Sequence, residues 1–147
     1  MIQKLPTELI SKMPTDDYTI DEAPCSMVAI SCMLADLGIK LTSEKIENSN
    51  FVVKNNSGYK TLRDMTKTLR VLMPKIKYHY FIKKDRLRLK QVPYVKDKSI
   101  ICLRGHYIYA KDDVYYSFFD NIHDEVIAMW WLEEEKDKKE SEQKCPC

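Results

Sequence analysis

The sequence is poor in glycine, with three among 147 residues, and this scarcity argues against a Gly-rich phosphate loop of the P-loop or dinucleotide-binding kind. It also lacks a run of roughly 20 apolar residues, the length that a membrane span requires. Residues 1–17 lack the charged start and apolar run of a secretory signal. We therefore expect a soluble, cytoplasmic protein with neither nucleotide hydrolysis nor a membrane partner.

Cysteines are few and scattered, at positions 25, 32, 102, 145 and 147. A small secreted domain would show a dense, even-numbered set for disulfides, and the terminal "CPC" lacks the paired spacing of a zinc site. The thiols are expected to be reduced, and we assign no metal and no cofactor.

The net charge of +2 conceals an uneven distribution. Residues 54–90 hold 12 Lys or Arg against two acids, a net +10 that leaves −8 on the remainder. Within them, "KIKYHYFIKKDRLRLK" (75–90) interleaves cations with aromatic residues, as a nucleic-acid partner would require. An edge strand with a solvated basic face gives the same alternation and is favoured, so a nucleic-acid partner ranks lower.

The chain length suits one domain, which we place at residues 18–132. Residues 1–17 are interpreted as an N-terminal extension. Residues 133–147 are charged and without apolar periodicity, which predicts a flexible tail.

Local patterns predict helices first and strands afterwards. In "DEAPCSMVAISCMLADLG" (21–38), Pro24 suits a first turn and Gly38 a C-terminal cap, and the nearly continuous apolar surface indicates a central helix over 24–37. A short helix is expected from Thr42 or Ser43, and an amphipathic one over 59–73, ended by Pro74. Runs rich in β-branched and aromatic residues predict strands at 76–82, 99–104, 106–111, 114–120 and 125–132. This order favours the α+β class, with an antiparallel sheet.

Three residues in this framework carry reactive groups: Cys25, His106 and Asp120. If a three-residue loop joins strands 106–111 and 114–120, His106 lies opposite Asp120 on a shared face. A two-residue loop would place Phe119 there, and a bulge would then be needed to bring Asp120 round.

The chemistry of such a trio is that of a nucleophile with its base. A carboxylate beside an imidazole fixes its tautomer and stabilises its cation, and a helix N-terminus favours a thiolate. The alternative is that Cys25 is a small hydrophobe at a helix start and His106 an ordinary strand residue.

The order of a Cys-bearing first helix, then "RGHYIYAKDDVYYSFFDN" and "EVIAMWWL", resembles the papain-like cysteine peptidases. It is most similar to bacteriocin-leader peptidase domains and to small phage and bacterial proteins with a Gly-His hairpin. The resemblance covers about residues 18–132 and implies a papain-like fold. It makes Cys25 the nucleophile, His106 the general base and Asp120 the orienting residue. A viral origin is compatible with it.

One departure from the family concerns the Gln that usually precedes the cysteine and completes the oxyanion hole. "YTIDEAP" offers Thr19, Asp21 and Glu22 instead. Two functions follow as hypotheses: a cysteine peptidase or related thiol hydrolase that cleaves an amide bond in a peptide or protein, and a catalytically silent papain-like module that binds a protein or nucleic acid.

Overall fold

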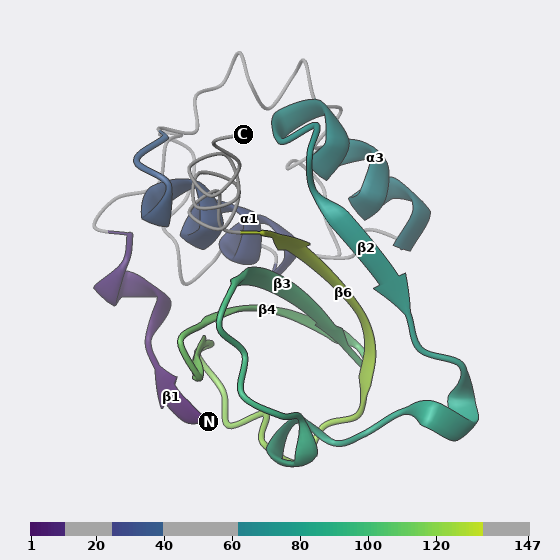
Figure 1. Cartoon of the computed structure of the whole chain (residues 1–147). Coiled ribbons are helices and arrows are strands. Elements are labelled where there is room, and N and C mark those ends of the chain that lie inside the picture. Colours follow the sequence, from purple (N-terminus) through teal and green to yellow (C-terminus); the bar gives the residue numbers. More distant parts are fainter. Residues whose placement is uncertain (11–24, 40–61, 134–147) are drawn as a thin grey trace, which may run out of the picture.

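The computed structural model describes residues 1–10, 25–39 and 62–133 (Figure 1). Within these residues a six-stranded sheet carries two helices, α1 (Cys25–Asp36) and α3 (Leu62–Leu72), whose apolar side chains join one core. The strands are β1 (Ile2–Lys4), β2 (Lys77–Tyr80), β3 (Lys98–Leu103), β4 (His106–Lys111), β5 (Val114–Tyr116) and β6 (Val126–Leu132). The predicted α+β class is confirmed.

The strand order is β1-β5-β4-β3-β6-β2, and the pairs from β5 to β2 are antiparallel, as predicted. The edge strand β1 differs, because it runs parallel to β5 from Ile2↔Val114 to Lys4↔Tyr116. We expected residues 1–17 to precede the domain, yet Ile2–Lys4 belong to its sheet. All three side chains are exposed, so this strand leaves no apolar pattern in the sequence.

Helix α1 is buried nearly all round, with every residue from Ser26 to Leu34 inside the fold. The C-terminal end of α1 is joined to β4, because the Tyr109 hydroxyl donates a hydrogen bond to Asp36 Oδ2 at 2.5 Å. Gly38 then takes a φ of +75° and, as predicted, caps the helix, since Ile39 N–H bonds back to the Leu34 carbonyl. The central position predicted from the apolar surface is confirmed.

Helix α3 is amphipathic and packs one face onto the same core through Met65 and Leu69. A hydrogen bond of 2.9 Å from Trp130 Nε1 to Thr66 Oγ1 ties it to β6. Trp130 is fully buried, whereas Trp131 on the other face of β6 is half-buried.

The two faces of the sheet carry separate apolar cores. We call the cluster beneath α1 and α3, which includes Ile100 and Trp130, the helix-face core. The opposite cluster, which includes Leu89, Ile101 and Ile108, is the far-face core. It is covered by the chain between β2 and β3, which makes 3-10 turns at Lys83–Asp85 and Leu89–Gln91 (Figure 1).

Some expectations lie outside the described residues: the short helix after Thr42 or Ser43, the residues that precede Cys25, and the tail from 134 onward. Within the described residues, no helix is both long and apolar enough to cross a membrane.

Candidate active site

Cys25 is the first residue of α1 and is half-buried against the start of β4. Its sulfur is hydrogen-bonded by the backbone N–H of Tyr107 and approached by the N–H groups of Ser26 and of Cys25 itself. Strand β5 does not reach this part of β4, because the last pair of the two strands joins Tyr116 to Tyr109. The N-terminus of α1 therefore brings the thiol to the open edge of β4, beside the residue that follows His106.

The pKa of the Cys25 thiol is raised above its ordinary value. Burial is the larger effect, and the three backbone N–H groups lower the pKa by less than burial raises it. We expected the helix N-terminus to favour a thiolate, but the same packing that centres the helix removes water from the sulfur. At neutral pH the group is a thiol, and it needs a base to become a nucleophile.

The hairpin between β4 and β5 has a two-residue turn, Asp112 and Asp113, with φ values of 52° and 61°. Lys111 pairs with Val114, so the three-residue register is wrong. A pair of residues with positive φ twists the hairpin in the right-handed sense of the sheet, and aspartate tolerates that conformation.

Asp120 does not pair with His106. Its Oδ1 accepts hydrogen bonds from the Tyr115 hydroxyl at 3.2 Å and from Ile122 N–H at 3.1 Å. Strand β5 ends at Tyr116, so the chain has already turned before residue 120. The exposed carboxylate therefore stabilises its own turn, and Asp120 is not the partner of His106 that the three-residue loop predicted.

The His106 imidazole lies with Nε2 at 3.2 Å from Ser117 Oγ, and its ring contacts Phe119 edge-on at 5.8 Å between centroids. Burial lowers the pKa of the imidazole below its ordinary value, and the negative charge of Asp124 opposes this shift. His106 is therefore neutral at pH 7 and able to accept a proton.

Alternation along β4 decides which face each side chain occupies. Tyr107 and Tyr109 enter the helix-face core, whereas Ile108 and Ala110 enter the far-face core. His106 shares the parity of Ile108 and bonds to Ser117 on that far face. The thiol and the imidazole thus approach the start of β4 from its two sides, one residue apart along the backbone.

Sequence reasoning missed Ser117, Asn121 and Asp124, which form a polar chain behind His106. The dipeptide Asp112–Asp113 could have predicted Ser117, because a two-residue turn at these positions places Ser117 diagonal to His106 on the same face of the hairpin. The three-residue loop that we expected places Asp120 opposite His106 instead.

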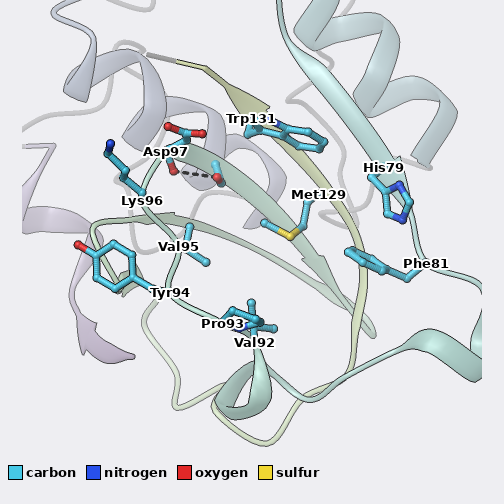
Figure 2. Close-up of a pocket in the computed structure, with 11 residues that line it drawn as sticks. His79, Phe81, Val92, Pro93, Tyr94, Val95, Lys96, Asp97, Met129 and Trp131 are labelled. Atoms are coloured by element: carbon cyan, nitrogen blue, oxygen red, sulfur yellow. Dashed lines mark hydrogen bonds between the residues drawn. The ribbon is translucent and has the colours of Figure 1, made fainter. Parts of the chain in front are cut away.

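A groove of about 370 Å³ lies on the far face of the sheet, between β2 and the segment 92–97 (Figure 2). Met129 and Trp131 of β6 form part of its floor. His79 of β2 and Phe81, just after that strand, line one side with their rings in edge contact at 4.5 Å. The opposite side is lined by Val92, Pro93, Tyr94, Val95, Lys96 and Asp97. Such a lining suits an aromatic or planar group.

The basic stretch 75–90 contributes the edge strand that the sequence predicts, with Lys77, His79 and Tyr80 of β2 exposed. One of its cations is committed to structure. Arg86 donates to the Tyr80 hydroxyl at 2.7 Å and to the Phe81 carbonyl at 2.9 Å, and it lies 3.5 Å from Glu125.

The described residues hold no group of three His, Cys, Asp or Glu side chains arranged to bind a metal ion. Comparisons with family models, with curated proteins and with solved structures found no match. The chemistry of the residues around Cys25 and His106 is therefore the basis on which a function is assigned.

Proposed function

We propose that this chain is a papain-like thiol hydrolase that cleaves an amide bond of a peptide or protein through an acyl-enzyme on Cys25. One observation carries the proposal: the sulfur at the N-terminus of the buried helix α1 is hydrogen-bonded to the backbone N–H of Tyr107, directly after His106. His106, the only described histidine at the start of β4, therefore lies one residue before the backbone N–H that bonds the Cys25 sulfur. The papain-like topology is part of the same proposal.

In this mechanism His106 takes the thiol proton. Its Nε2 is held by Ser117, so Nδ1 is the nitrogen that accepts the proton, and because the thiol and the imidazole lie on opposite sides of β4 the transfer runs through one water. The thiolate then attacks the carbonyl carbon, and the imidazolium returns the proton to the leaving amine. Backbone N–H groups of Cys25 and Ser26 lie at the sulfur and act as oxyanion donors in place of the Gln that the family carries.

The test is hydrolysis of a mixture of internally quenched peptides by the full chain. We expect Cys25→Ala to abolish cleavage and His106→Ala to reduce it by about 10²-fold or more, the usual contribution of a general base. Cys32→Ala is the matched control, because Cys32 is a fully buried thiol two turns further along α1. Full activity in Cys25→Ala, or equal losses in both cysteine variants, would contradict the proposal.

A second candidate is a catalytically silent module that binds a partner protein. The orientation of His106 toward the far face favours it, because thiol and imidazole then stay apart. The aromatic groove between β2 and the segment 92–97 offers such a module a binding site for an aromatic side chain of a peptide (Figure 2).

Fluorescence of Trp131 distinguishes this candidate. Addition of a Tyr- or Phe-containing peptide should change the emission of the wild type but not of Trp131→Phe, whose remaining Trp130 is fully buried. Binding without cleavage of any peptide supports the silent module, whereas cleavage that needs Cys25 excludes it. A response only to a single-stranded oligonucleotide, lost at high salt, would favour a nucleic-acid partner instead.

A further inference from the structure

Three side chains behind the His106 imidazole continue from it as a chain of hydrogen bonds on the far face of the sheet. His106 Nε2 lies 3.2 Å from Ser117 Oγ, Ser117 Oγ lies 2.5 Å from Asn121 Oδ1, and Asn121 Nδ2 lies 2.7 Å from Asp124 Oδ2. Ser117 and Asn121 are only 3% and 6% exposed, so water does not compete for most of their bonds. The direction in which each proton points can be worked out from one end of this chain.

Asp124 sets the donor and the acceptor of each hydrogen bond in the chain. An ionised carboxylate has no proton to donate, so the side-chain amide of Asn121 must present its NH₂ group to it. The opposite end of that amide, Oδ1, then faces Ser117 and can only accept. The amide orientation of Asn121 is thereby fixed by its charged neighbour.

The hydroxyl of Ser117 has one proton and two lone pairs. Its proton goes to Asn121 Oδ1, and one lone pair accepts the backbone N–H of Phe119 at 3.1 Å. The lone pair that remains faces His106 Nε2. In this contact the imidazole must therefore be the donor.

We propose that Asp124, acting through Asn121 and Ser117, holds His106 in the tautomer with its proton on Nε2 and leaves the lone pair on Nδ1. These three residues are positioning residues, which replace the carboxylate of Asp120 in that role. That Nδ1 receives the proton of Cys25 rests on the proposed function, whereas the tautomer itself does not. On proton transfer, the S–H bond breaks, an N–H bond forms at Nδ1, and the imidazolium keeps its Nε2–H bond to Ser117.

The experiment is NMR of the ¹⁵N-labelled full chain, at a pH above the titration of the imidazole. The wild type should show a proton on Nε2 of His106 that exchanges slowly enough to be observed, and a ring Nδ1 without a proton. Ser117→Ala should lose the slow Nε2 proton and Ser117→Thr, which retains the hydroxyl, should restore it. Asp124→Asn should make the Nε2 proton of His106 exchange faster with water, because an amide at 124 no longer fixes the orientation of Asn121.

Asp120→Asn is the matched control, since Asp120 is the neighbouring carboxylate bound to Tyr115 and Ile122. It should leave the His106 signals unchanged. A proton on Nδ1 in the wild type, or equal effects of Asp120→Asn and Asp124→Asn, would overturn the proposal. If Ser117→Ala does not fold, the comparison of the two aspartate variants decides.

These outcomes are separable from those of the proposed function. The expected tautomer in a chain that cleaves no peptide leaves the hydrogen-bond chain standing and removes the hydrolase. If cleavage depends on Cys25 but the proton of His106 is on Nδ1, the hydrolase proposal stands and the tautomer proposal is wrong. In an active enzyme, Ser117→Ala should lower kcat with little change in KM, and Ser117→Thr should recover it, because these groups do not touch the substrate.

Discussion

The two faces of the sheet are built in different ways, and the polar chemistry is divided between them accordingly. One face is covered by α1 and α3 and is filled with large apolar side chains, while the other is covered mainly by irregular chain between β2 and β3 (Figure 1). Beneath the helices, polar side chains form single ties such as Tyr109–Asp36 and Trp130–Thr66. The His106 hydrogen-bond chain and the aromatic groove both lie on the face that loops cover.

The position of Cys25 follows from the same difference. It belongs to the helix-covered side but sits at the end of α1, where backbone N–H groups replace part of the lost hydration. The other two described thiols, Cys32 and Cys102, are buried and have pKa values raised to about 12 and about 11. Among the three described thiols, Cys25 at the helix end is the one that remains half-exposed.

A matched pair of core substitutions should separate the two faces most clearly. Ile100 and Ile101 are adjacent on β3, and each is 0% exposed, one in each core. We expect Ile100→Ala to lower the free energy of unfolding by about 4 kcal/mol and Ile101→Ala by about 2 kcal/mol, because loops close over a cavity more readily than packed helices. Urea denaturation measures both, and equal losses would show that the far face is as rigid as the helix face.

A second pair tests the tryptophans of β6. Trp130→Phe removes the hydrogen bond to Thr66 and part of a ring that is fully buried, so we expect a loss of roughly 1–3 kcal/mol. Trp131→Phe, on the half-buried groove side, should cost less than about 1 kcal/mol. Thermal denaturation gives both values, and a reversed order would place the groove within the stabilising core.

Alkylation of the thiols should follow their positions relative to α1. At pH 8, iodoacetamide should modify Cys25 first and Cys102 next, and Cys32 last, since only a thiolate reacts and burial suppresses it. The difference of about one pKa unit between Cys102 and Cys32 alone corresponds to about tenfold in thiolate content. Peptide mass spectrometry over time measures each site separately, and faster labelling of Cys32 than Cys25 would show that the helix end is not accessible.

The smallest expected effect is the pH dependence that His106 contributes. Its folded pKa is lowered by burial, so between the ordinary value of 6.5 and the lowered value the unfolded chain binds a proton that the folded chain does not. The contribution is therefore absent well above pH 6.5, and stability falls as the pH drops through this window.

The matched variant is His106→Gln, which can still donate to Ser117 but does not titrate. Its free energy of unfolding, measured in urea between pH 7.5 and 5.5, should decline less than that of the wild type. Carboxylates contribute equally to both proteins, so equal slopes would refute the lowered pKa.

Much of the framework could be predicted from the sequence, because its signals are local. Residues 24–37 and 59–73 were expected to be helical, and the helices span Cys25–Asp36 and Leu62–Leu72. Periodicity and the helix-ending signals of Gly38 and Pro74 act within a few residues, and tertiary contacts did not override them. The position of Cys25 at a helix start was fixed in the same way.

Only the tertiary structure decided the surroundings of His106, the edge strand β1 and the pKa of Cys25. Side chains alternate along a strand with a period of two, so a change of one residue in a turn exchanges the neighbours on each face. With the two-residue turn, Ser117 rather than Asp120 is the hydrogen-bond partner of His106. Asn121 and Asp124 follow behind Ser117 in the same chain of hydrogen bonds. Burial likewise depends on what the rest of the chain packs against a residue, and no local pattern specifies it.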